Sequence, residues 1–183
     1  LKRGLEFGKK EFDEIDRYCK EKGIMWYASP WDEASVDFLE QYNPPCYKIA
    51  SASATDKDLI LYIKSKGRPI IVSTGMMGEA TIDRVVEILG EKNLVIMHCT
   101  STYPAKTDEL HLRNIPRLIK KYPKAYIGYS GHEVGAYPPL IAEDVLCGVI
   151  FFSATFVWAS IVLVWQICAV AGKSLAQEMQ YFD

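Results

Sequence analysis

Residues 94–103 read Leu-Val-Ile-Met-His-Cys-Thr-Ser-Thr-Tyr, a short apolar run that ends in small hydroxyl side chains. An apolar run of this length, bounded by polar residues, is typical of a strand that is buried on both faces. Four other runs have the same design, at residues 24–28, 47–50, 69–73 and 125–129. The sequence therefore predicts five buried strands.

Segments with helical periodicity separate these runs, at residues 11–22, 35–41, 56–65, 81–89 and about 109–121. Alternating strands and helices predict an α/β fold, with a parallel sheet and helices outside it. Each predicted strand ends in small polar residues. In a barrel such ends converge on one active site, whereas an open sheet uses mainly one switch point, so the pattern favours a (β/α)8 TIM barrel over a doubly wound sheet.

The composition excludes several classes of protein. The chain has 21 Lys+Arg against 23 Asp+Glu, which gives a formal net charge of −2 and no basic field for nucleic acid. Five cysteines form no CxxC pair, which argues against a zinc ribbon or a disulfide framework and favours reduced thiols in the cytoplasm. GxGxxG and GxxxxGK[ST] motifs are both absent from the sequence, so it predicts neither a dinucleotide nor a nucleoside triphosphate site.

Small hydroxyl side chains follow all five predicted strands. Hydroxyls beside exposed backbone N–H groups can hold a phosphate, whereas any one serine alone could simply cap a helix. Five in register at one end of a barrel favour an anion site. These serines are Ser29, Ser51, Ser73, Ser101 and Ser130.

One lysine and one histidine accompany these serines. Lys48 is the only lysine inside a predicted strand. Burying an ammonium group there is costly in free energy unless the group pairs with an anion or takes part in the chemistry. The alternative is a lysine on an edge strand with its ammonium group in solvent. His132 follows the fifth strand and could ligate a metal or transfer a proton. We expect His98 to face the barrel wall and His111 to lie on the surface.

Three further residues are expected near the same end of the sheet. Tyr103 and Asp32 lie in loops that would close over it, although Asp32 could instead cap a helix. Among the cysteines, which otherwise read as small buried hydrophobes, Cys99 is the one adjacent to the predicted site.

Four motifs carry a resemblance to a known family: Tyr-Lys-Ile-Ala-Ser at 47–51, Ser-Thr-Gly-Met at 73–76, His-Cys-Thr-Ser-Thr-Tyr-Pro at 98–104 and Ile-Gly-Tyr-Ser-Gly-His-Glu at 127–133. In order and spacing, residues 1 to about 150 resemble the sialic acid synthase (NeuB-type, N-acetylneuraminate synthase) family. The resemblance implies a (β/α)8 barrel that condenses phosphoenolpyruvate with an N-acetylmannosamine-type sugar. It also implies a Mn²⁺ or Mg²⁺ ion and, for full-length members, a homodimer.

The resemblance assigns roles to the candidate residues. Lys48 and four serines, Ser51, Ser73, Ser101 and Ser130, would hold the phosphate and carboxylate of phosphoenolpyruvate, and Ser29 stands where the family usually has threonine. Tyr103 would contact the sugar, and His132 would be one of two metal-ligating histidines. Lys48, Tyr103 and His132 are thus the expected catalytic residues. Ser53 departs from the family, which commonly has an acidic residue there.

The same resemblance places the chain at about strands 3 to 8 of the barrel. Two βα units would precede Leu1, and a small antifreeze-like domain would follow the barrel. We expect a partial synthase domain at residues 1–150 and a divergent apolar tail at residues 151–183. We also expect the chain alone to be inactive and not to retain the metal. Another phosphoenolpyruvate-dependent aldol synthase is the alternative enzyme.

The tail leaves three interpretations open. Residues 145–172 form a stretch without any charged side chain. This stretch is longer than the ~20 residues that a membrane span needs. The family would instead have strand eight here, ending in Glu-Arg-His-Ile-Thr with the second metal histidine, whereas residues 151–156 read Phe-Phe-Ser-Ala-Thr-Phe. Codons for Arg-His-Ile read one base later give Ala-Thr-Phe. The tail is therefore a frameshift product, a membrane helix tethering a non-catalytic remnant, or a divergent barrel strand.

Overall fold

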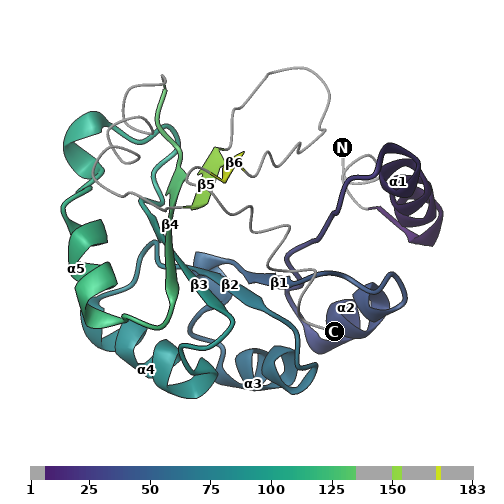
Figure 1. The fold of residues 1–183 in the computed structure, drawn as a ribbon, viewed down its shortest axis with the longest axis horizontal. Helices are drawn as coiled ribbons and strands as arrows, with labels where there is room; N and C mark the ends of the chain where they lie inside the picture. The colour runs from purple at the N-terminus through teal and green to yellow at the C-terminus, as the bar shows by residue number, and fades with distance from the viewer. Residues whose placement is uncertain (1–6, 135–149, 154–167, 170–183) are drawn as a thin grey trace.

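A computed structural model describes the fold of residues 7–134, 150–153 and 168–169, and the side chains of residues 7–134. Its sheet contains six strands in the order of the chain (Figure 1). The first five are parallel, and the last pairs antiparallel with the fifth. They are β1 (Tyr47–Ile49), β2 (Ile70–Ser73), β3 (Leu94–Cys99), β4 (Tyr126–Gly131), β5 (Ile150–Ser153) and β6 (Cys168–Ala169).

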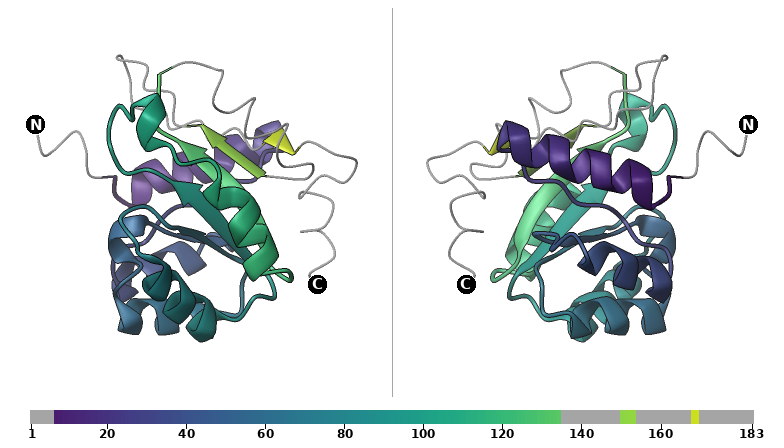
Figure 2. Two further views of the ribbon diagram at one scale, coloured as in Figure 1. Left: turned by 90° about the vertical axis from the view of Figure 1, so that its left-hand side faces the viewer. Right: turned by 90° about the vertical axis from the view of Figure 1, so that its right-hand side faces the viewer.

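Helices cover the outer side of this sheet. Four of them form an arc around β1 to β4, and α1 lies apart from the arc, beyond the β1 edge (Figure 1). The side views show the helices of residues 57–65 and 79–89 at the bottom of the molecule and β5 and β6 near its top (Figure 2). The parallel α/β arrangement confirms the predicted fold class. The helices are α1 (Lys9–Lys22), α2 (Glu33–Glu40), α3 (Lys57–Ser65), α4 (Glu79–Leu89) and α5 (Asn114–Lys121).

Alternation along the strands gives the sheet two different faces. Side chains at one set of positions, such as Ile49, Val72 and Ile96, join the main core beneath the helices. The positions between them point to the opposite face, where Ile71 and Met97 belong to a second, smaller cluster. We call these the outer and inner faces of the sheet.

Two predicted elements were wrong in part. Residues 24–28 form no strand: Ile24 and Met25 are exposed, and residues 26–28 are only partly buried against the apolar clusters. The helix predicted at 109–121 is divided into a short 3-10 turn, Thr107–Glu109, and α5. His111 between them adopts φ +45°, a left-handed conformation that a continuing helix does not allow.

The start of the apolar tail continues the parallel sheet. β5 pairs with β4, with Phe151 opposite Tyr129 and Ser153 opposite Gly131. These four residues of the predicted tail therefore belong to the sheet. Among the residues that the structure describes, no helix is long and apolar enough to cross a membrane. Apart from residues 168–169, the rest of the tail lies outside the described residues. Most of the region on which the frameshift and membrane interpretations rest therefore lies outside them too.

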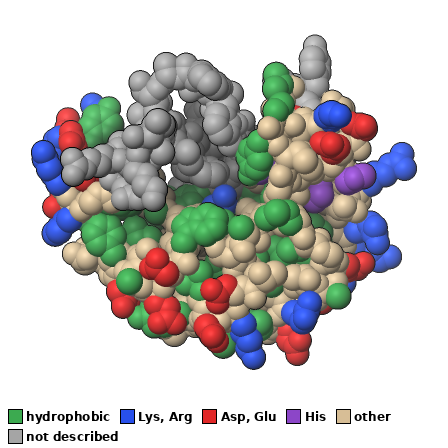
Figure 3. All heavy atoms as spheres, turned by 180° about the vertical axis from the view of Figure 1, so that it is seen from behind, with side chains coloured by type: hydrophobic (Ala, Val, Ile, Leu, Met, Phe, Trp, Pro, Cys, Tyr) green, Lys and Arg blue, Asp and Glu red, His purple; other side chains and the backbone are tan. Residues whose placement is uncertain are grey.

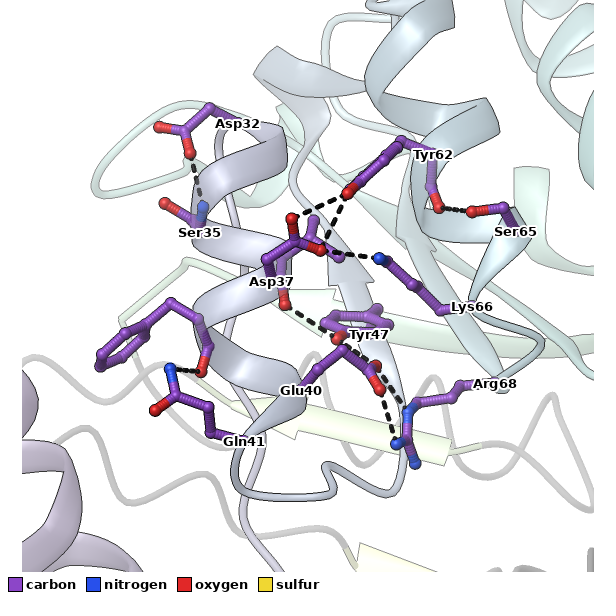
Figure 4. A network of polar contacts seen from close by, with 12 residues as sticks. Asp32, Ser35, Asp37, Glu40, Gln41, Tyr47, Tyr62, Ser65, Lys66 and Arg68 are labelled. Atoms are coloured by element: carbon purple, nitrogen blue, oxygen red, sulfur yellow. Dashed lines mark hydrogen bonds and ion pairs between the residues drawn. The ribbon is translucent and has the colours of Figure 1, made fainter.

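A polar network fixes α2 to the amino end of the sheet (Figure 4). The Arg68 guanidinium donates to both carboxylate oxygens of Glu40, at 2.8 and 2.9 Å, and to the Pro44 carbonyl at 2.8 Å. The Tyr47 hydroxyl donates to the same carboxylate at 2.6 Å. This bidentate pair lowers the pKa of Glu40 below its usual range. Because Tyr47 opens β1, the network holds the strand that carries Lys48.

Asp32, one of the two residues expected in a loop over the site, caps α2 instead. Its carboxylate accepts the Ser35 backbone N–H at 2.7 Å (Figure 4). A carboxylate at this position satisfies an otherwise unpaired N–H of the first helical turn. The capping alternative considered from the sequence is thus the one observed.

Candidate active site

Four residues meet where β1, β2 and β3 end. The Ser51 Oγ lies 3.4 Å from the Cys99 Sγ, and the Gly75 N–H donates to the same sulfur at 3.1 Å. A Cβ built on Gly75 would overlap the Ser101 Oγ and would lie 2.9 Å from the Ser51 Oγ. We call Ser51, Gly75, Cys99 and Ser101 the serine cradle.

The serine cradle is a consequence of parallel pairing. Its members are separated by up to 50 residues in sequence, yet each follows or ends a strand at the same edge of the sheet. Two hydroxyls and a backbone N–H thereby converge without any charged side chain among them. Small donors of this kind are suited to the oxygens of a phosphate or carboxylate group.

Three more predicted residues lie on the inner face of the sheet beside the serine cradle. Lys48 lies between Tyr47 and Ile49 of the outer core, so its side chain points inward. Burial lowers the pKa of Lys48, and the neighbouring Cys99 opposes this shift. The Ser73 side chain is 4% exposed, and its hydroxyl has no hydrogen-bond partner among the described residues. Ser130 is buried and is paired with Cys99 across β3 and β4.

Ser29 is the one predicted serine that the structure does not bring into this group. It lies in the irregular segment before α2 and is half-buried. Because residues 24–28 form no strand, Ser29 does not follow a strand end, which was the basis of its prediction. No described contact joins it to the serine cradle.

Tyr103 and His132 come together above the ends of β3 and β4. Their rings are 4.2 Å apart between centroids, and the Tyr103 hydroxyl lies 3.2 Å from the His132 Nε2. The His132 Nδ1 lies 2.7 Å from the Thr100 carbonyl oxygen, which can only accept. The hydrogen is therefore assigned to Nδ1, and Nε2 keeps a lone pair towards the Tyr103 hydroxyl.

Tyr103 also lies close to the serine cradle. Its side chain is 62% exposed. The pKa of Tyr103 is raised, first by partial burial and then by its electrostatic interaction with the neighbouring Cys99. The phenol thus lies between the exposed opening of the site and the buried residues of the serine cradle.

Among the described residues, the His132 side chain is the one that is well oriented to bind a metal ion. The His132 Nε2 has the orientation that second-shell hydrogen bonding gives to metal-binding imidazoles. Residues 7–134, however, contain no group of three His, Cys, Asp or Glu side chains that could hold an ion. The part of the chain that the structure describes therefore does not by itself form a metal site.

The other two histidines lie where the sequence predicted. His98 belongs to the outer face, where its ring stacks against Tyr129 and its Nε2 lies 2.8 Å from the Leu110 carbonyl oxygen. Burial lowers the pKa of His98. His111 is exposed in the loop before α5. His98 thus anchors the loop that follows β3, and neither imidazole enters the site.

Sequence reasoning missed the role of Gly75. The Ser-Thr-Gly sequence at the end of β2 was the available signal, because a glycine at a strand end often marks close approach of another group. Neither the approach of Ser101 nor that of Cys99 could be read from the sequence, since both depend on how β2 and β3 pair. Met76 follows in a left-handed conformation, with φ +63° and 73% of its side chain exposed.

A cleft of about 1140 Å³ opens between α4 and α5 on the outer side of the sheet, where Ile82, His98 and Leu118 line it. It runs from α4 and α5 to the carboxyl ends of β2 and β3, where Thr74, Cys99 and Ser101 form part of its wall. Seen from behind, the molecule is hollowed at its upper centre, where hydrophobic side chains and a Lys or Arg side chain are visible, and acidic and basic side chains are spread over the lower surface (Figure 3). Ser51, Gly75 and Lys48 are not among the residues that line this cleft, so it belongs to the outer face of the sheet rather than to the inner face of the serine cradle.

Comparison with known proteins gives three consistent results. A family model described as the NeuB family matches residues 1–163. N-acetylneuraminate-9-phosphate synthase of Homo sapiens is 38% identical over 136 residues, which are 73% of this chain and 38% of that protein. Pseudaminic acid synthase of Campylobacter jejuni is 34% identical over 132 residues, 70% of this chain and 38% of that protein. The chain thus spans well under half the length of these curated relatives.

A solved structure supports the same relationship. The N-acetylneuraminic acid (sialic acid) synthetase of Leptospira borgpetersenii, in complex with citrate, superposes with a TM-score of 0.72 at 32% identity. The match covers 75% of this chain and 48% of that one.

Proposed function

Because this chain belongs to the NeuB family, we propose that it forms part of a synthase that condenses phosphoenolpyruvate with an N-acylated amino sugar. The product would be a sialic acid or a related nonulosonic acid. Relatives that make different nonulosonic acids have similar identity to this chain, so the proposal is for the class of sugar. Its parallel sheet would be the wall of a (β/α)8 barrel.

The serine cradle is the observation that carries this proposal. Phosphoenolpyruvate bears a phosphate and a carboxylate, so it requires several donors and a positive charge. The cradle offers the Ser51 and Ser101 hydroxyls, and Lys48 projects onto the same inner face. The buried Ser73 hydroxyl, which has no partner among the described residues, supplies a further donor to an anion.

The residues at the opening would act on the sugar. The Tyr103 hydroxyl and the His132 Nε2 face each other at 3.2 Å, where a sugar could replace their mutual contact. In the proposed reaction the enol carbon of phosphoenolpyruvate bonds to the sugar aldehyde carbon, water then adds, and phosphate leaves. Lys48 stabilises the phosphate throughout, because its ammonium charge complements the anion.

The proposed Mn²⁺ or Mg²⁺ ion would polarise the sugar aldehyde when bound. His132 is the described residue that would contribute a ligand, but the described residues do not complete the site. We therefore assign no step to the metal and expect no turnover by the 183-residue chain alone. A cytoplasmic location and a homodimer of the whole protein complete the proposal.

Titration of phosphoenolpyruvate into the full chain tests the anion site directly. Replacing Lys48 by Met should weaken binding at least about tenfold, because a charge-assisted hydrogen bond contributes about 1.5–3 kcal/mol. Lys92→Met is the matched control, since Lys92 is exposed at the opposite end of β3. No binding by the wild-type chain, or equal binding by the two variants, would reject the proposal.

A further inference from the structure

The loop that follows β3 carries Tyr103 to the opening of the site. Two hydrogen bonds close the base of this loop. The Nε2 of the buried His98 lies 2.8 Å from the Leu110 carbonyl oxygen. The Thr100 hydroxyl donates to the Glu109 carbonyl oxygen at 3.0 Å. Both bonds lie where the loop leaves and rejoins the fold, so neither of them determines where the phenol lies.

The Glu109 carboxylate connects the two halves of the same loop. Its Oε2 accepts the Thr102 hydroxyl at 2.9 Å and the Lys106 backbone N–H at 3.1 Å. The Lys106 N–H first, and then the Thr102 hydroxyl, lower the pKa of Glu109, so the side chain is charged near neutral pH. Hydrogen bonds to a charged acceptor are stronger than bonds between neutral groups. One carboxylate oxygen therefore holds the residues on both sides of the segment 103–105.

This segment is also attached to the end of β4. The Ala105 N–H donates to the His132 carbonyl oxygen at 3.0 Å. The Tyr103 hydroxyl lies 3.2 Å from the Nε2 of the same histidine. Tyr103 thus lies between Thr102, which Glu109 holds, and Ala105, which His132 holds. The distance between the phenol and the imidazole consequently depends on where Thr102 is held.

We propose that Glu109 is a positioning residue, whose carboxylate holds Thr102 and Lys106 and thereby keeps the Tyr103 phenol against the His132 imidazole. Its carboxylate bonds to the loop rather than to either ring, so it acts through the loop. Without the carboxylate, residue 102 loses its acceptor and the phenol moves away from Nε2. The lone pair that the hydroxyl covers is then open to solvent. That the same carboxylate sets the gap for a sugar rests on the proposed function.

Diethyl pyrocarbonate tests this arrangement in the full chain without any ligand. The reagent acylates the lone-pair nitrogen of a neutral imidazole, and peptide mass spectrometry gives a separate rate for each histidine. His132 should react at least about threefold faster in Glu109→Ala and in Tyr103→Phe than in the wild type, because the hydroxyl no longer covers Nε2. His98 and His111 are internal references, one buried and one exposed, and their rates should not change. Faster reaction of His98 together with His132 would show general unfolding and would overturn the positioning role.

Three further variants separate the hydrogen bonds from other effects of the substitution. Glu109→Gln keeps a carbonyl acceptor, so His132 should react at close to the wild-type rate. Thr102→Val removes the donor and should accelerate His132, but adding it to Glu109→Ala should give no further gain. Asp108→Ala is the matched control, because Asp108 is an exposed acidic residue of the same 3-10 turn. An unchanged His132 rate in Glu109→Ala, or an equal acceleration by Asp108→Ala, would overturn the inference.

N-acetylmannosamine distinguishes failure of this inference from failure of the proposed function. A sugar that replaces the contact between Tyr103 and His132 should change the His132 rate of the wild-type chain as its concentration rises, with phosphoenolpyruvate present. A rate that the sugar leaves unchanged would reject the proposed role of the two rings in sugar binding. The comparison of Glu109→Ala with the wild type in the absence of sugar decides the positioning role by itself.

Discussion

No side chain can be present at residue 75 while the Ser101 hydroxyl keeps its position. A Cβ on Gly75 would overlap the Ser101 Oγ and would lie 2.8 Å from the Cys99 Sγ. Gly75 does not adopt a positive φ, so space rather than backbone conformation requires the glycine. The Ser101 hydroxyl thus occupies the space that a side chain at residue 75 would need.

Gly75→Ala should therefore abolish phosphoenolpyruvate binding while the chain still folds. Overpacking at such a site costs about 1–3 kcal/mol, which denaturant titration of the variant will measure. Gly78→Ala is the matched control, because a Cβ on Gly78 would meet no atom within 4 Å. Adding Ser101→Ala to Gly75→Ala should recover part of the lost stability but not the binding; binding equal to wild type in the single variant would contradict the role of Gly75.

The stability of the fold should decrease as the pH falls from about 7 to 5, and His98 should cause part of the decrease. Burial lowers the pKa of His98 in the folded state below its usual value of 6.5. Below pH 6.5 the unfolded chain binds a proton that the folded chain takes up less readily, so protonation favours unfolding. The free energy of unfolding, measured by urea titration at each pH, should change less steeply in His98→Gln. An identical slope in His111→Gln and His98→Gln would show that His98 does not contribute.

The Glu40–Arg68 pair should affect stability in a separate, more acidic range. The Arg68 guanidinium holds the pKa of Glu40 below its usual 4.5, so the stabilisation is fully present above that value. It should be lost as the pH falls through the lower folded-state pKa. At pH 7 a double-mutant cycle with Glu40→Gln and Arg68→Met should give a coupling energy of about 1 kcal/mol, and near pH 2 the coupling should vanish. The exposed pair Arg17–Glu21 should couple more weakly.

The 183-residue chain should bind Mn²⁺ weakly. His132 is the one imidazole that the described residues direct to the opening of the site, and a single imidazole competes poorly with water for a divalent ion. Isothermal titration should give a dissociation constant well above micromolar, with little further loss in His132→Ala. Micromolar or tighter binding that His132→Ala removes would show that residues outside the described ranges complete a metal site.

Much of the fold could be predicted because buried parallel strands leave a local signal. The run at residues 94–99 predicted β3 with its observed bounds, and the runs at 69–73 and 125–129 predicted β2 and β4 within two residues at each end. Residues 24–28 carry a similar run but form no strand. Apolar composition reports that a segment prefers burial, whereas pairing depends on its neighbours.

The site was predictable as a set of positions but not as a set of contacts. Ser51, Ser73, Ser101 and Ser130 could be found because each follows or ends a strand. The approach of Ser51 to Cys99 joins residues 48 positions apart, and no local pattern encodes it. The same is true of the contact between Tyr103 and His132. The start of the helix before β4 was not predicted, because the left-handed residue His111 is not a glycine and so gave no sign of a break in the helix.

Neighbouring residues of β3 face opposite ways: His98 points outward to Leu110, and Cys99 points inward to Gly75. Deleting one residue within this strand would exchange the two, placing an imidazole in the serine cradle and a thiol where the loop needs an anchor. No compensating slip is available, because β3 is paired on both sides. Insertions and deletions that survive among relatives should therefore fall in the segment after Cys99, or before Leu94, and not between them.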